Sequence, residues 1–223
     1  MQPSAEKSPS GADGPASDWH HPEPRDGWLG TWDRFVGPGA TASELLLSGA
    51  AATLAALMVS VYAGLNDLDW AWYQYLVAII ITFDLVGGVV TNATPSAKRW
   101  YHRRGQGPRE HFSFVAWHAI QVAAIAWFFQ ETGALLYFLW VYLYVLLTAA
   151  VTLMVPIKLQ RSMALLSVCG AVMLADWVLA PTPGLEWFLP ILSLKLVVSH
   201  VTREEPYFHP SPAPLSSSEQ RHT

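Results

Sequence analysis

The stretch ALLYFLWVYLYVLLTAAVTLMV, residues 134–155, decides the fold class of this chain. It contains no charged residue, and a helix of about 20 residues is long enough to cross a hydrocarbon core about 30 Å thick. Five more apolar stretches lie around it, at residues 42–64, 70–91, 112–129, 162–180 and 185–201. The sequence therefore predicts an all-α, polytopic transmembrane bundle of about six helices.

The distribution of charge supports a membrane protein. The chain of 223 residues is 52% hydrophobic and only 13% charged, which is about half the charged fraction of an average soluble domain. Most of the charged side chains lie in the tails and loops, outside the six stretches. This segregation excludes an ordinary soluble globule and an all-β sandwich. A single cysteine, Cys169, excludes a disulfide scaffold.

The sixth stretch, 185–201, is the shortest and carries Pro190 and Lys195 inside it and Glu186 at its edge. If this stretch lies flat or re-enters the membrane, the carboxyl tail emerges on the opposite side.

Three segments flank the transmembrane domain, 42–201. Residues 1–25 and 202–223 have the polar composition of disordered tails. Residues 26–41 form an interfacial segment in which Trp28, Trp32 and Phe35 recur at helical spacing. This pattern favours a short amphipathic helix in the membrane interface, although an aromatic loop is the alternative. Because no apolar region precedes residue 42, we expect the first span to be an uncleaved anchor.

The positions of the basic residues predict orientation. With the N-terminus placed in the cytoplasm, twelve of the 13 lysines and arginines fall on the cytoplasmic side and none in an outer loop. The twelve are Lys7, Arg25, Arg34, Lys98, Arg99, Arg103, Arg104, Arg109, Lys158, Arg161, Arg203 and Arg221. By the positive-inside rule we expect a multi-pass protein of the cell membrane with cytoplasmic N- and C-termini. The lipid bilayer, with anionic headgroups on the cytoplasmic side, is its expected partner.

Three ionisable residues lie at one predicted depth inside the spans. Asp84, His118 and Lys195 each fall six or seven residues from the cytoplasmic end of their stretch, about 9–10 Å inside the boundary. Because a carboxylate facing lipid is costly, we expect Asp84 to face the bundle and pair with His118. Lys195 would join this pair or extend to the inner surface, and Gln121 shares a helix face with His118. Together they form a candidate polar intramembrane site, or only a clasp between helices.

A second set of candidates lies at the cytoplasmic interface. Its members are Asn92, Thr94, Lys98, Arg99, His102, Arg103, Arg104 and His111. Basic and aromatic side chains beside a membrane most simply contact anionic headgroups. The alternative is a bound phosphate-bearing substrate, and we expect no nucleic acid. No cysteine pair, Walker loop or zinc motif is present in the sequence, so we expect no metal ion and no cofactor.

One region resembles a known family. The run DLVGGVVTNAT at 84–94, followed by KRWYH at 98–102 and HFSFVAWH at 111–118, is similar to a family of small multi-pass bacterial membrane proteins with no assigned activity. The resemblance implies a polytopic membrane protein, and it supplies no substrate and no catalytic role.

Three functions are compatible with these patterns. One is a small transporter or membrane-assembly component with the Asp84–His118 pair on an internal polar path. A second is an intramembrane enzyme acting on a lipid or isoprenoid-like, phosphate-bearing substrate at the inner leaflet. A third is a scaffold whose polar layer only fixes packing. The sequence leaves open whether the protein is an enzyme and whether it forms a homo-oligomer.

Overall fold

A computed structural model describes residues 19–204; residues 1–18 and 205–223, which include most of both predicted tails, lie outside the described residues. The elements are α1 (Gly27–Val36), α2 (Ala42–Leu65), α3 (Trp72–Ala93), α4 (Pro95–Tyr101), α5 (Pro108–Trp117), α6 (Ala119–Phe129), α7 (Ala134–Met154), α8 (Ile157–Trp177), α9 (Phe188–Ser193) and the π-helix η1 (Leu194–Val201). The prediction of an all-α bundle is confirmed for the described part of the chain.

Five of these helical segments are long and apolar enough to span a membrane. They are α2, α3, the segment Pro108–Phe129 that joins α5 and α6, α7 and α8. The sixth, Phe188–Val201, is apolar but shorter. The predicted number of about six spans is therefore consistent with the fold, and the chain has the architecture of an integral membrane protein.

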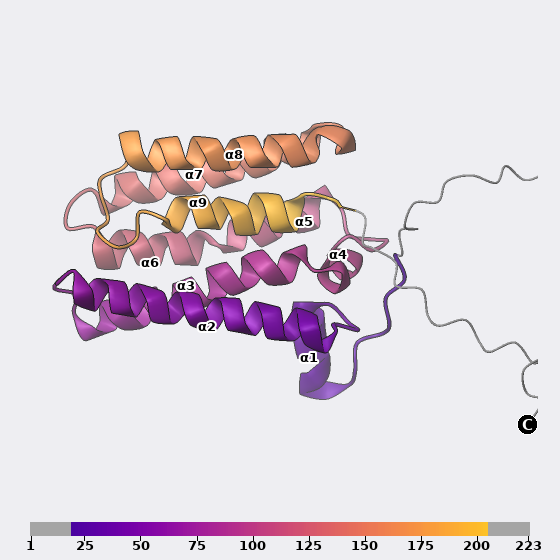
Figure 1. Cartoon of the computed structure of the whole chain (residues 1–223). Coiled ribbons are helices and arrows are strands. Elements are labelled where there is room, and N and C mark those ends of the chain that lie inside the picture. The colour runs from indigo at the N-terminus through magenta and orange to yellow at the C-terminus, as the bar shows by residue number, and fades with distance from the viewer. Residues whose placement is uncertain (1–18, 205–223) are drawn as a thin grey trace, which may run out of the picture.

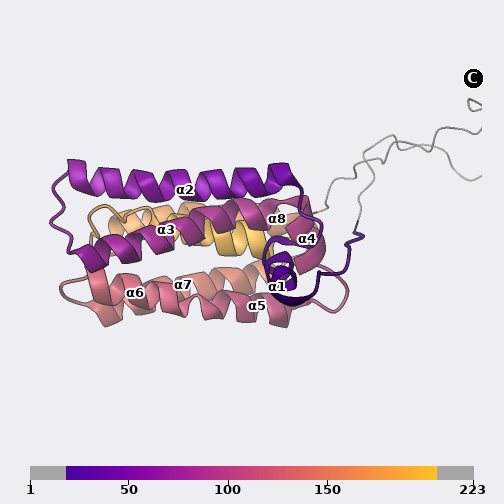
Figure 2. The same cartoon turned by 90° about the horizontal axis from the view of Figure 1, so that it is seen from below.

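The shortest span lies at the centre of the bundle. α9 and η1 run between the other helices in both views (Figures 1 and 2) and contact α3, α7 and α8, with η1 also contacting α5. Almost every side chain from Phe188 to Thr202 is buried or half-buried. α2 lies at the edge of the bundle, against α3.

α1 and α4 lie together at one end of the bundle, where both termini of the described chain also emerge (Figure 1). We refer to this end, which holds the described arginines and lysines other than Lys195, as the basic end. α1 agrees with the predicted interfacial helix and leaves Trp28 78% exposed. It is fixed to α4 because Tyr101 Oη donates to the Phe35 carbonyl (2.9 Å) and Ser96 Oγ to the Val36 carbonyl (3.4 Å).

α4 is an element that the sequence analysis treated as loop. Thr94 Oγ1 accepts a hydrogen bond from the Ala97 amide (3.3 Å), and Pro95 occupies the first turn. A threonine cap followed by proline is a common start for a helix. The segment 92–111 therefore folds back against the bundle through a short helix and does not only connect two spans.

The third span is interrupted at His118. Its Nδ1–H donates to the Phe114 carbonyl (2.8 Å), which would otherwise accept the backbone N–H of residue 118. That N–H binds the Val115 carbonyl (3.1 Å), three residues back. A side chain inserted into the helical hydrogen-bond ladder is a recognised cause of a kink. The predicted single helix 112–129 is therefore two helices, α5 and α6.

Candidate functional site

Asp84 and Lys195 form an ion pair inside the bundle. Lys195 Nζ, on η1, donates to Asp84 Oδ2, on α3, at 2.5 Å. Gln121 Nε2, on α6, donates to the same oxygen. The Lys195 side chain is 5% exposed and that of Asp84 33% exposed. A buried ammonium is tolerated only with a charged partner, and three helices supply the groups that meet here.

Gly88 makes room for the lysine stem. A Cβ atom at this position on α3 would lie 2.5 Å from Lys195 Cε and 2.9 Å from Cδ. Such distances are shorter than any ordinary van der Waals contact, so only glycine lets the stem cross α3 one turn beyond Asp84. The neighbouring Gly87 instead faces Ala52 of α2.

His118 does not hydrogen-bond to Asp84, contrary to the pairing we predicted. Its Nδ1 is engaged by the Phe114 carbonyl of its own helix, and the carboxylate oxygen Oδ2 is taken by Lys195 and Gln121. His118 is nevertheless close enough for the charges of Lys195 and Asp84 to act on it. The physical reason is the tautomer, because a neutral imidazole that donates its Nδ1–H to the Phe114 carbonyl has no second N–H to donate to the carboxylate.

Three histidines meet nearer the basic end. His111 Nδ1 lies 3.2 Å from His200 Nε2, and the rings of His102 and His111 stack at 4.5 Å. His102 Nε2 donates to the His200 carbonyl at 3.0 Å, and Phe114 stacks on the His200 ring at 3.8 Å. Burial and the neighbouring His111 and Lys98 lower the pKa of His102 to about 3, so this imidazole is neutral at pH 7.

His200 is a member of this cluster that the sequence analysis missed. It lies at the end of the sixth stretch, where a histidine suggests only an interface position. No local pattern in the sequence marks His200, because the side chains that meet it, His102 and His111, lie 98 and 89 residues away in the chain. On η1, Lys195 reaches α3 and His200 reaches α5.

Lys98 is buried and holds the end of η1. Its Nζ donates to the carbonyls of Ser199 and Thr202, both at 2.7 Å, which are otherwise unpaired groups at a helix C-terminus. Burial lowers the pKa of Lys98 to about 8. The side chain is 3% exposed, so it does not point to the membrane surface as a headgroup contact would require.

The other interface candidates are divided between the interior and the surface. Asn92 and Thr94 are buried at the junction of α3 and α4, and Asn92 Nδ2 has no hydrogen-bond partner among the described residues. Arg99 is half-buried, with Nε unpaired within the same residues. Arg103 and Arg104 line a cavity described next.

Two cavities reach the ionisable residues. The first, which we call the lateral groove, is about 150 Å³ between α1, α2 and α3, and Trp32, Phe35, Phe83 and Asp84 are among its lining residues. The second, which we call the vestibule, is about 480 Å³ at the basic end. The vestibule is lined by Trp19, His21, His102, Arg103, Arg104, Gly105, Gln106 and Arg203.

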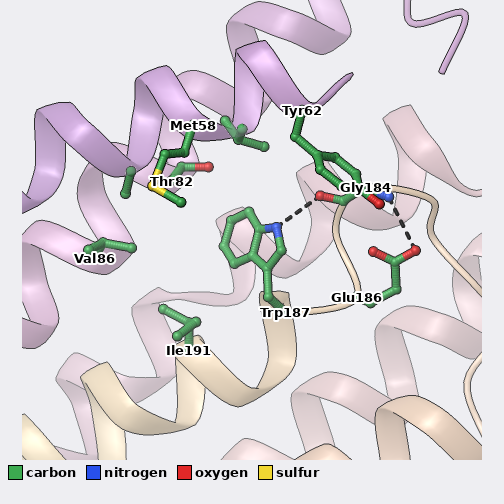
Figure 3. A pocket seen from close by; sticks show the side chains of 10 residues that line it. Met58, Tyr62, Thr82, Val86, Gly184, Glu186, Trp187 and Ile191 are labelled. Atoms are coloured by element: carbon green, nitrogen blue, oxygen red, sulfur yellow. Dashed lines mark hydrogen bonds between the residues drawn. The ribbon is translucent and has the colours of Figure 1, made fainter. Parts of the chain in front are cut away.

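A third cavity, about 330 Å³, lies between α2, α3 and α9 and is lined mainly by apolar side chains (Figure 3). Trp187 projects into it and donates Nε1–H to the Gly184 carbonyl at 2.8 Å. Neither the ion pair nor the histidine cluster borders this cavity.

Within residues 19–204, no group of three histidine, cysteine, aspartate or glutamate side chains is arranged to hold a metal ion. The histidines of the cluster instead face one another and backbone carbonyls.

No family model, no curated protein and no solved structure matches this chain. The similarity of residues 84–118 to small bacterial membrane proteins therefore stays a resemblance, and the function has to be argued from the site itself.

Proposed function

We propose that this protein conducts protons across the cell membrane, either alone or coupled to a solute, and that the part of the route nearest the basic end is a polar path from the vestibule to Asp84. The observation that carries the proposal is the central position of α9–η1. The most enclosed helix of the bundle holds Lys195 against a carboxylate and His200 against two further histidines. Ionisable residues inside spans commonly mark ion pathways and proton relays.

The first part of the path runs through the histidine cluster. His102 borders the vestibule, its ring stacks on His111, and His111 contacts His200. A neutral imidazole has one protonated and one free nitrogen, so it accepts a proton on one side and releases one on the other.

The second part of the path joins the cluster to the ion pair. His118 lies within electrostatic range of His200, Lys195 and Asp84, and water bridges between these side chains complete the path in this proposal. Asp84 Oδ2 is occupied by two donors, whereas its other oxygen has none within residues 19–204 and the side chain borders the lateral groove. In this proposal Asp84 is therefore the innermost proton acceptor of this part of the route.

The test is proton flux into liposomes that contain the purified full-length protein and an internal pH-sensitive dye, driven by a potassium diffusion potential. We expect Asp84→Asn to lower the flux at least about tenfold, as loss of a relay group does, because an amide does not take up the proton. The amide oxygen still accepts the Lys195 hydrogen bond but does not balance its charge, so flux is compared only after an unfolding titration in detergent shows that the variant folds. His102→Gln, at the other end of the path, should lower the flux in the same direction.

Asp176→Asn is the matched control, since it also removes one carboxylate from a spanning helix but at an exposed position. It should conduct like the unaltered protein. No flux above that of protein-free liposomes, or equal flux in Asp84→Asn and Asp176→Asn, would overturn the proposal.

We also propose that the basic end faces the cytoplasm, with both termini on that side, from the distribution of lysine and arginine. The test replaces Cys169 with serine and introduces one cysteine at Asp67 or at Gln106. A membrane-impermeant thiol reagent applied to intact cells should label the first variant and not the second. The reverse pattern would contradict this orientation.

The lateral groove favours a second candidate, the intramembrane enzyme. Asp84 is among the side chains that line this mainly apolar groove between α1, α2 and α3, which suits a lipid chain. This function predicts that the protein in detergent consumes a polyprenyl phosphate and that Asp84→Asn abolishes the reaction. The histidines argue against it, because His102 and His111 converge on His200 and not on Asp84.

A further inference from the structure

The vestibule is surrounded by positive charge. Arg103, Arg104 and Arg203 all line it, and no aspartate or glutamate does. The described ion pairs at this end of the bundle involve other cations, with Glu204 lying near Lys98 and Arg161 and Asp33 near Arg25. Among the described residues, the three vestibule guanidiniums therefore have no carboxylate within 4.0 Å.

Two of these guanidiniums are held in place by aromatic rings. Arg103 Cζ lies 3.5 Å from the centre of the Trp100 ring, and its Nη1 donates to the Trp100 carbonyl at 2.5 Å. Arg203 Cζ lies 4.7 Å from the centre of the Trp19 ring. Stacking uses the face of the guanidinium plane and leaves N–H groups at its edge for a ligand.

The positive charge of Arg103 is also only partly balanced by the groups around it. Burial lowers the pKa of its guanidinium, and the charges of Tyr101 and Glu23 offset this only in part. An anion in the vestibule would supply the missing partner. The vestibule volume of about 480 Å³ falls in the range of small-ligand sites, about 300–1,000 Å³.

We propose that the vestibule binds a phosphate group, contributed either by an anionic lipid headgroup or by a soluble phosphate compound. Arginine is suited to this ligand because its planar fork matches two phosphate oxygens at once. Trp19 lines the vestibule, and the Trp100 ring lies against the Arg103 guanidinium. Tryptophan is favoured at the level of lipid headgroups. The vestibule is also the entrance of the proposed proton path, through His102. The phosphate site uses the arginines instead and is tested by binding, so either proposal can fail without the other.

The test is isothermal titration of the full-length protein in detergent, in two arms. One arm uses a short-chain phosphatidylglycerol, and the other uses inorganic phosphate. Arg104→Gln is the primary variant because Arg104 is exposed, so the fold does not depend on it, and we expect it to weaken binding about fivefold. The triple variant Arg103→Gln, Arg104→Gln, Arg203→Gln should weaken it more than about tenfold.

Arg109→Gln is the matched control, since Arg109 is an exposed arginine at the same end but does not line the vestibule. It should bind like the unaltered protein. Binding of the lipid alone identifies a headgroup site, and binding of inorganic phosphate as well identifies a site for soluble phosphate compounds. No binding in either arm, or equal loss in Arg104→Gln and Arg109→Gln, would overturn the proposal.

Discussion

α2 and α9–η1 are opposite kinds of membrane helix. α2 is 24 residues long, and of these it buries only the small side chains Ala52, Ala56, Val59 and Ala63. α9–η1 is the shorter segment, yet it buries large apolar residues together with Lys195, Ser199 and His200. This difference in burial teaches that a hydropathy pattern most readily identifies an exposed apolar helix such as α2. The helix that carries the buried ionisable residues has a shorter apolar run because polar side chains interrupt it.

The largest expected effect is on the ion pair that only the central helix has. Asp84→Leu leaves the Lys195 ammonium buried without its carboxylate, which should lower the free energy of unfolding by about 3 kcal/mol. The double variant Asp84→Leu, Lys195→Leu should recover most of this loss, because no unpaired charge remains. Unfolding in mixed detergent micelles measures both. A double variant as unstable as the sum of the two single variants would show that the pair is not coupled.

The next largest expected difference between α9 and α2 is the loss of unfolding free energy when a large apolar side chain is removed. Phe188 of α9 is 0% exposed and Leu57 of α2 is 58% exposed. Phe188→Ala opens a cavity and should cost about 3 kcal/mol, whereas Leu57→Ala exchanges one apolar contact with lipid for another and should cost less than about 1 kcal/mol. The same micelle titration compares them, and equal losses would place α9 at the lipid surface.

A smaller difference is expected for two glycines. Gly88→Ala brings a methyl group onto the Lys195 stem and should cost about 1 kcal/mol, with a several-fold loss of proton flux because the displaced stem changes the contact of Lys195 with Asp84. Gly64→Ala in α2, where no atom lies within 4 Å of the added methyl, should be neutral or slightly stabilising. Flux and unfolding measured on both variants test this, and it fails if Gly88→Ala behaves like Gly64→Ala.

The smallest effect is the dependence of stability on pH through Lys98, which fixes the end of η1. Its folded-state pKa of about 8 lies below the ordinary 10.5, so between these values the unfolded chain binds more protons and stability rises with pH. The gain should be about 1 kcal/mol between pH 8 and about pH 9. Lys98→Met should remove it, whereas Lys158→Met, in an exposed position, should retain it. A rise of equal size in both variants would contradict this assignment.

The sequence was sufficient for the elements that depend on local composition. The five long spans and α1 follow from the lengths of apolar runs and the spacing of Trp28, Trp32 and Phe35. The break at His118, the helix α4 and the π-helix were not predicted. They depend on particular hydrogen bonds, such as those from His118 to Phe114 and from Lys98 to Ser199, and these form only when the tertiary structure is in place.

The sequence identified residues of the candidate site better than it identified their contacts. Asp84 and Lys195 were candidates because they share one predicted depth in the membrane, and their side chains form an ion pair. The choice of His118 as partner of Asp84 was wrong. Sequence order made the adjacent spans the natural pair, but the His118 ring donates to Phe114 of its own helix and Lys195 of the last span reaches the carboxylate. Lys98 was predicted to contact headgroups because it lies among other basic residues. The sequence of a basic cluster does not show which of its side chains is buried.

The π-helix gives the centre of the bundle a mechanical property. Eight residues, Leu194–Val201, are wound with one more residue in each hydrogen-bonded ring than an α-helix has. In an α-helix, residues five apart project about 140° apart around the axis, so rewinding this segment to the α form would change the directions in which Lys195 and His200 project. A change of winding confined to one short segment would thus alter both the contact of Lys195 with Asp84 and that of His200 with His111.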